Sequence, residues 1–251
     1  MEVINMWYSK NFPLKSMCIF SLIYLFYLTG IVHAQGDTLE TTEGRNFDLR
    51  WHLEGSLVIG AGFKSHVIGK TNENDDIKIS GGGGIGGNLM LGYSLSPALD
   101  LGAEVSIQSS SLQPKVENAS GSFPRTAVSA KIKYRIPVSS IGSINLGGGV
   151  GYYMPGELDI DASSVPGGAH NIYDYDKAVG FQLFGEYEGF FSSSFGWIAG
   201  VKYSNVTFDL NSVNSNGINV PLNLLPSDIK NELSELDGSG IDLVLSLTYY
   251  F

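Results

Sequence analysis

The feature that most constrains the fold of this chain is an alternation of apolar and polar residues with a period of two. In the last such stretch, Leu243 and Leu245 share one face of an extended chain, while Asp242 and Ser246 share the other. This pattern is typical of a β-strand with one face in an apolar environment and the other in a polar one. Eight stretches follow it, at residues 47–63, 77–95, 99–107, 128–136, 144–152, 179–188, 195–204 and 241–251.

The composition supports an all-β fold and argues against nucleic-acid binding. Charged residues make up 16% of the chain, against about 25% in ordinary soluble domains. The 251 residues include 32 glycines, 13 tyrosines and 13 phenylalanines, which suits strands joined by turns. The formal net charge is −10, so the chain as a whole repels a phosphate backbone.

The N-terminal residues have the pattern of a secretory signal peptide. Lys10 and Lys15 precede an apolar run at 17–28, and Val32-His33-Ala34 fits the small-x-small pattern of a cleavage site. A retained membrane anchor is the alternative, but a run of 12 residues is short of the roughly 20 that cross a bilayer. We therefore predict a signal peptide at 1–34, a periplasmic tail at 35–45 and a barrel domain at 46–251.

The connections between the eight stretches alternate in length. Short turns at 96–98, 139–142 and 192–194 alternate with long connections at about 64–76, 112–125, 155–177 and 210–239. This alternation is typical of outer-membrane barrels, in which the turns are periplasmic and the long loops extracellular. We therefore predict an all-β fold, an eight-stranded antiparallel up-and-down transmembrane β-barrel. The alternative is a soluble, lipocalin-like barrel whose apolar face points inward.

Aromatic residues on the apolar face favour the membrane alternative. Six of them fall near the short-turn ends of their strands, where an outer-membrane barrel places a girdle at the membrane interface. A soluble barrel would instead bury this face. The predicted girdle consists of Trp51, Tyr93, Tyr134, Trp197, Tyr249 and Phe251.

On these features the chain resembles the small outer-membrane barrels that include the OmpA transmembrane domain and OmpX. The resemblance covers residues 46–251 and is carried by the eight-strand layout and by the last strand. That strand reads Asp242-Leu243-Val244-Leu245-Ser246-Leu247-Thr248-Tyr249-Tyr250-Phe251. The resemblance implies that the terminal aromatic, Phe251, is the signal read by the barrel-insertion machinery.

Charged residues on the polar face are predicted to fill the barrel interior. Eight strands leave an interior just wide enough for side chains, and an unpaired buried charge costs several kcal/mol. We therefore expect an ion-pair network that closes the lumen; a narrow ion path and a catalytic acid pair are the alternatives. The predicted network comprises Arg50, Glu54, Asp100, Glu104, Lys131, Lys133, Arg135, Glu186, Glu188, Lys202 and Asp242. The expected pairs are Glu104 with Lys131, Asp100 with Arg135, and Glu186 and Glu188 with Lys202 and Lys133.

The sequence predicts no catalytic, cofactor or metal site. The histidines after the signal peptide, His52, His66 and His170, have no metal-ligand spacing, and a His-x-Ser pair of the kind found in lipid-cleaving barrels is absent. Cys18 is the only cysteine and lies in the signal peptide, so no disulfide is expected. Acidic residues gather in the loops at 73–76 and 157–176, where Ca²⁺ or Mg²⁺ bridging to lipopolysaccharide is the alternative to a solvated surface.

The fourth long connection contains a predicted short helix at 228–236. Ser227 is expected to cap its N-terminus, and Ile229, Leu233 and Leu236 form one apolar stripe. We expect this stripe to pack onto the rim of the barrel or onto Leu222, Leu224 and Leu225; a partner-binding surface is the alternative.

The preferred functional hypothesis is a structural or surface-interaction role, in adhesion or envelope integrity, carried by the long loops. The alternatives are a membrane-embedded lipid-modifying enzyme and a small-solute or ligand-binding barrel. The expected partners are outer-membrane lipid and lipopolysaccharide, with the barrel-assembly machinery acting during biogenesis. We expect a monomer in the outer membrane that binds no nucleic acid.

Overall fold

The fold was analysed in a computed structural model, which describes residues 51–251 except 72, 140, 141 and 166. The predicted signal peptide at 1–34, the predicted tail at 35–45 and Arg50 lie outside the described residues.

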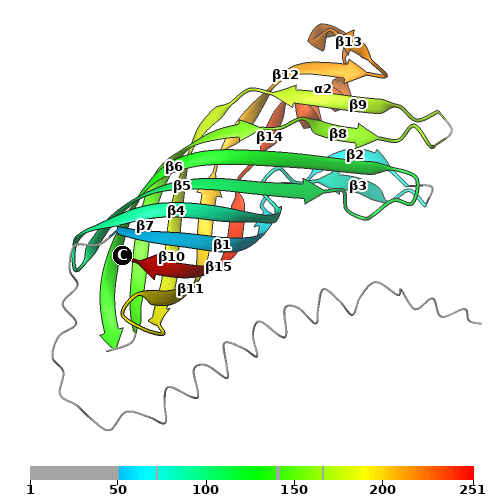
Figure 1. The fold of residues 1–251 in the computed structure, drawn as a ribbon. Coiled ribbons are helices and arrows are strands. Elements are labelled where there is room, and N and C mark those ends of the chain that lie inside the picture. The colour runs from blue at the N-terminus through cyan, green and yellow to red at the C-terminus, as the bar shows by residue number, and fades with distance from the viewer. Residues whose placement is uncertain (1–50, 72, 140–141, 166) are drawn as a thin grey trace, which may run out of the picture. The chain divides into compact units, whose positions relative to one another are not determined.

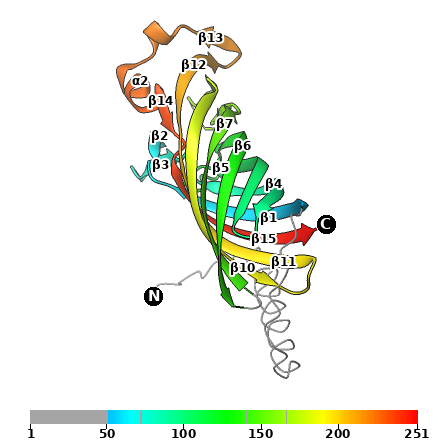
Figure 2. The ribbon, with the colours of Figure 1, turned by 90° about the vertical axis from the view of Figure 1, so that its left-hand side faces the viewer.

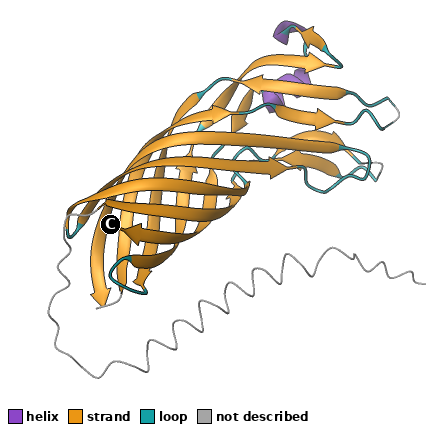
Figure 3. Cartoon of the chain, viewed as in Figure 1, coloured by secondary structure: helices purple, strands orange, loops and turns teal. Residues whose placement is uncertain are grey.

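Eight antiparallel strands form a closed barrel (Figures 1 and 3). Each strand pairs with the next around the ring, and the pairing of β6 with β7 completes it. The predicted fold class is therefore confirmed. The barrel strands are β1 (Trp51–Gly62), β4 (Gly84–Ser96), β5 (Leu99–Ser111), β6 (Ser120–Ser139), β7 (Gly142–Pro155), β10 (Ala178–Phe190), β11 (Phe195–Asn205) and β15 (Gly240–Tyr250).

The apolar face of every barrel strand points outward. Along β15, alternate residues are exposed and buried, so that Leu243 is 60% exposed while Asp242 is 1% exposed. On β6 the outward apolar residues run from Val128 to Val138, with Ser122 on the same face above them. A strand needs about 9–11 residues to cross a bilayer, so this belt has the length of one membrane crossing.

The long connections fold together into a second region, which we call the cap (residues 63–83, 112–123, 156–177 and 206–239). Its regular structure is mostly strand, with two short helices (Figure 3). None of the helices found in the described part of the chain has the length and apolar character needed to span a membrane. The cap elements are β2 (His66–Lys70), β3 (Asp76–Ile79), β8 (Leu158–Asp161), β9 (His170–Tyr175), β12 (Thr207–Ser215), β13 (Ile218–Val220), η1 (Leu222–Leu224), α2 (Ser227–Leu233) and β14 (Glu235–Asp237).

The cap has an apolar core, supplied by all four long connections together with Ala127 of β6 and Tyr153 of β7. Aromatic rings such as Phe123 and Phe208 meet edge to face in this core, with ring centroids 5.8 Å apart. The described chain therefore has two interiors, a charged one inside the barrel and an apolar one inside the cap. The core residues are Ile79, Leu112, Phe123, Ala127, Tyr153, Leu158, Tyr173, Tyr175, Val206, Phe208, Val213, Leu233 and Leu236.

Two local predictions are corrected by the structure. The stretch 77–95 is not one strand: Ile79 belongs to the β2–β3 hairpin and is buried in the cap core, and β4 begins only at Gly84. The glycines before β4 allow this break, and Gly84 has a φ of +117°, which a side chain would oppose. The predicted cap by Ser227 is also wrong, because α2 follows Pro226 and has no side-chain cap. The helix also ends earlier than predicted, at Leu233, and Leu236 of the predicted stripe lies on β14. Ile229, Leu233 and Leu236 pack into the apolar core of the cap rather than onto the barrel rim.

Candidate functional site

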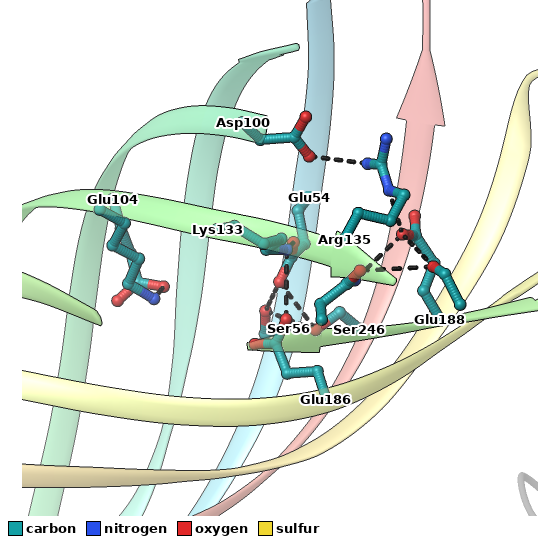
Figure 4. A network of polar contacts seen from close by, with 12 residues as sticks. Glu54, Ser56, Asp100, Glu104, Lys133, Arg135, Glu186, Glu188 and Ser246 are labelled. Atoms are coloured by element: carbon teal, nitrogen blue, oxygen red, sulfur yellow. Dashed lines mark hydrogen bonds and ion pairs between the residues drawn. The ribbon is translucent and has the colours of Figure 1, made fainter. Parts of the chain in front are cut away.

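Ten of the eleven residues predicted for the lumen network lie within the described chain, and all ten are buried. They come from six of the eight barrel strands, and period-two alternation points them into the barrel. Figure 4 shows how Glu54, Asp100, Lys133, Arg135, Glu186 and Glu188 converge inside the ring. The ten residues are Glu54, Asp100, Glu104, Lys131, Lys133, Arg135, Glu186, Glu188, Lys202 and Asp242.

Arg135 anchors the part of the network nearest the short turns. Its Nη2 donates to Asp100 Oδ2 at 2.7 Å and to the Tyr250 hydroxyl at 3.1 Å, and its Nε lies 3.4 Å from Glu188 Oε2. Tyr250 in turn donates to the Glu188 carboxylate, and Asn145 Nδ2 donates to it at 3.0 Å. The guanidinium thus contacts two carboxylates and a hydroxyl oxygen, and a buried cation needs such partners.

Two lysines occupy the middle of the lumen. Lys133 Nζ lies 3.2 Å from both Glu54 Oε2 and Glu186 Oε2, and Lys131 pairs with Glu104. Ser246 supports the cluster, because its hydroxyl donates to Glu54 Oε1 at 3.1 Å. Small residues leave room for this filling: a Cβ on Gly147 would lie 2.3 Å from the ring of Phe184.

The strand registers explain which pairs form. Asp100 lies opposite Lys133 across β5 and β6, so the contacts of Asp100 with Arg135 and of Glu104 with Lys131 run diagonally. Lys202 does not pair with a glutamate as expected. It lies directly opposite Asp242 across β11 and β15, with its Nζ 3.4 Å from Asp242 Oδ2. The pairs that form are Glu104 with Lys131, Asp100 and Glu188 with Arg135, Glu54 and Glu186 with Lys133, and Asp242 with Lys202.

Sequence reasoning missed Arg125, which ties the cap to the top of the barrel. Its Nη1 donates to the carbonyl oxygens of Gly81 at 3.0 Å and Gly238 at 2.6 Å, and its Nη2 donates to the carbonyl oxygen of Gly82 at 3.1 Å. Nη2 also donates to the side chain of Gln108. Arg125 thereby holds the first and fourth long connections across the end of the lumen, and no local pattern in the sequence signals these distant partners.

The predicted aromatic girdle lies on the outer surface at the short-turn end of the barrel. Four of its members are exposed and two are partly buried. The rings of Trp51 and Tyr93 are in contact, with centroids 4.9 Å apart. The rings of Tyr249 and Phe251 are stacked, with centroids 6.0 Å apart. The exposed members are Trp51, Tyr134, Tyr249 and Phe251, and the partly buried ones are Tyr93 and Trp197.

A second group of aromatics, which the sequence analysis did not single out, marks the opposite edge of the belt. Tyr203 lies between Phe63 and Phe181, with ring centroids 5.7 Å and 5.9 Å away. Aromatic residues at both edges of an apolar band are typical of barrels that cross a membrane.

The cap presents a polar outer surface on β8, β9 and β12, which we call the cap face (Glu157, Asp159, Asp161, His170, Ile172, Asp174, Ser212 and Asn214). Leu158, Tyr173 and Val213 point from the same strands into the core, so their sequence neighbours point outward. Pairing places Asp174 beside Ser212 and Ile172 beside Asn214. Extending the register from Leu158 and Tyr173 places Glu157 beside Asp174.

A cleft of about 410 Å³ crosses the cap face. The carboxylates of Glu157 and Asp174 both line it, with Ile172 as an apolar part of its lining. Among the described residues no lysine or arginine forms an ion pair with either carboxylate. His170 also lines the cleft, and its Nε2 lies 2.9 Å from Asp159 Oδ1.

Histidine and acidic side chains do not gather into a metal site within the described residues, where no group of three or more is placed to hold an ion. His52 is buried in the lumen against the ring of Tyr250, with centroids 5.1 Å apart. His66 and His170 lie in the cap.

Comparison with known proteins places the fold but no closer relationship. No family model matches the chain, and no curated protein sequence matches it. The solved structure of OprG from Pseudomonas aeruginosa matches with a TM-score of 0.52 at 9% identity, over 81% of this chain and 96% of OprG. Neisserial surface protein A matches with a TM-score of 0.46 at 11% identity, over 81% and 97%. Ail of Yersinia pestis matches with a TM-score of 0.42 at 12% identity, over 81% and 97%.

The fold assignment rests on the closed ring of strands and on the likeness to OprG, which is an outer-membrane protein. The chain therefore has the fold of the small eight-stranded outer-membrane β-barrels.

Proposed function

We propose that the protein resides in the outer membrane, where the barrel is a closed anchor and the cap binds a partner outside the cell. The division of the described chain supports this proposal. Paired charges fill the barrel interior, whereas the cap is a folded unit with its own core and an accessible polar surface. An even number of strands and the short turns would place the cap on the extracellular side.

The observation that carries the proposal is the cleft on the cap face. Glu157, just before β8, and Asp174 on β9 both line the cleft, and the register extended from Leu158 and Tyr173 places them side by side. Like charges placed directly opposite each other destabilise a sheet, and the described residues supply no cation to offset them. A partner that brings a positive charge would relieve this repulsion. We therefore infer a cationic ligand, such as the lysine or arginine side chains of a protein segment.

The proposed role is non-enzymatic, in adhesion or in the integrity of the envelope. The outer belt would contact outer-membrane lipid and lipopolysaccharide, and Phe251 would direct insertion by the assembly machinery. A solute path through the barrel is not part of the proposal, because ion pairs occupy the described lumen at several levels.

Binding of a lysine-rich peptide carrying a fluorescent label tests the proposal. The purified protein, folded in detergent micelles, is expected to raise the anisotropy of the peptide. The double variant Glu157→Gln/Asp174→Asn is expected to weaken this binding by about tenfold, because two charge-assisted contacts are lost. The difference in peptide affinity between the double variant and the unaltered protein is expected to be smaller at high salt.

A matched double variant, Glu73→Gln/Asp75→Asn, removes the same charge from another part of the cap, the turn between β2 and β3. It is expected to bind like the unaltered protein. Equal weakening by both double variants would mean that net charge alone attracts the peptide, and absence of binding by the unaltered protein would overturn the proposal of a cationic partner.

A further inference from the structure

His66 joins two parts of the cap that lie far apart in the sequence. It begins β2 in the first long connection, and its side chain is fully buried. The elements packed against it, α2 and β14, belong to the fourth long connection (Figure 2). The β2–β3 hairpin is therefore held to the fourth connection at this residue.

Both ring nitrogens of His66 bond to backbone atoms. Nδ1 lies 2.6 Å from the carbonyl oxygen of Glu232, and the backbone N–H of Asp237 donates to Nε2 at 3.2 Å. A carbonyl oxygen can only accept a hydrogen bond, and a backbone N–H can only donate one. The ring must therefore carry its single proton on Nδ1 and leave Nε2 unprotonated, so this contact selects the neutral imidazole.

We propose that His66 is a pH-sensitive latch, which holds the β2–β3 hairpin against α2 and β14 at neutral pH and weakens that contact in acid. A second proton, on Nε2, would point at the N–H of Asp237 and abolish that hydrogen bond. It would also leave a charge in a fully buried site, which costs free energy unless a partner accepts it. The latch goes beyond the binding role proposed for the cap and does not depend on it.

The charged groups around the ring act in opposite directions. Lys64, just before β2, disfavours protonation, whereas the carboxylates of Glu232 in α2 and Asp237 in β14 favour it. On β3, Ile79 lies opposite His66, while Lys78 Nζ and Asp76 Oδ2 pair with each other at 3.5 Å. Burial outweighs the carboxylates and lowers the pKa of His66 below its ordinary value of 6.5.

The direction of the pH effect follows from this lowered pKa. The released ring takes up its proton near pH 6.5, whereas the docked ring takes it up only at a lower pH. Docking is therefore at full strength above pH 6.5 and weakens as the pH falls from about 6.5 to the pKa of the docked ring. One proton changes the docking equilibrium by up to about tenfold per pH unit within that window.

Hydrogen exchange of the full chain in detergent micelles tests the latch. Protection of the amides at 227–237 is compared at pH 7.5 and pH 5.5, after correction for the intrinsic exchange rate at each pH. We expect this protection to fall at pH 5.5, by at most about tenfold, while protection of β15 stays unchanged. The variant His170→Gln, which alters the other histidine of the cap, is expected to behave like the unaltered protein.

The variant His66→Gln keeps a donor and an acceptor but cannot titrate, so its protection at 227–237 should be the same at both pH values, whether high or low. The latch is overturned if the unaltered protein protects these amides equally at both pH values. It is also overturned if His66→Gln retains the fall in protection at pH 5.5, because another group would then be the one that titrates.

Discussion

Replacing Arg135 by methionine is expected to lower the free energy of unfolding of the barrel by about 3–5 kcal/mol, the cost of leaving buried charges without a partner. Arg135 is 1% exposed and is the cation that both Asp100 and Glu188 contact. Methionine would fill much of the space but would leave both carboxylates buried without this cation. The measurement is unfolding of the protein in increasing concentrations of urea. The folded fraction is monitored by the gel mobility of unboiled samples.

Two further variants separate this effect from a general loss of charge. Lys177→Met removes an exposed cation at the start of β10 and is expected to change stability by less than about 0.5 kcal/mol. Adding Asp100→Asn to Arg135→Met removes one of the stranded charges and is expected to restore part of the lost stability. If Arg135→Met unfolds at the same urea concentration as the unaltered protein, the lumen is hydrated rather than closed by ion pairs.

Replacing Leu245 by arginine is expected to destabilise the barrel in lipid by about 2–4 kcal/mol, the cost of a cation near the bilayer midplane on the outer face of a barrel. Leu245 points outward midway along β15, beside Leu57 and Ala199 of the neighbouring strands. The measurement is urea unfolding in lipid vesicles, together with the fraction of protein that folds into them.

Asn211→Arg supplies the control for this substitution. Asn211 is exposed on β12, above the apolar belt, so an arginine there would remain in water and cost little. Equal stability of Leu245→Arg and the unaltered protein would show that the outer face of the barrel does not contact lipid.

The barrel could be predicted from the sequence because the same environment surrounds every strand. An apolar outer face and a charged interior impose one period-two pattern, which places Leu243 outward and Asp242 inward without reference to any distant residue. Even some ion pairs could be anticipated, because β5 and β6 follow each other in the chain and pair as neighbours, so a symmetric register brings Glu104 near Lys131 and Asp100 near Arg135. The partner of Lys202 could not, because it depends on the register between β11 and β15.

The strands of the cap could not be predicted in this way, because they surround an apolar interior rather than a charged one. The inward face that carries Lys202 and Ser204 on β11 continues along the chain as Val206 and Phe208 in the cap core, while Asp209 faces outward on β12. The alternation thus persists, but the inward face changes from polar to apolar where the strands leave the belt. A search for strands whose apolar residues face outward, as in the barrel, therefore finds only loops in this region.

The sequence also could not predict the single residues that join distant parts of the cap. Arg125 binds carbonyl oxygens of Gly81 and Gly238, and His66 binds backbone atoms of Glu232 and Asp237. Backbone atoms are present at every position, so the sequence contains no complementary side chain that would reveal such partners.

The central claim is that a membrane barrel holds the cap on the cell surface. It is tested most directly by labelling single cysteines on intact cells with a membrane-impermeant maleimide, starting from a chain in which Cys18 is replaced by serine. Lys230→Cys lies in α2 of the cap, and Ser193→Cys lies in the short turn between β10 and β11. We expect label at position 230 on intact cells and at position 193 only after the outer membrane is permeabilised. Label at position 193 on intact cells, or at position 230 only after permeabilisation, would contradict the account.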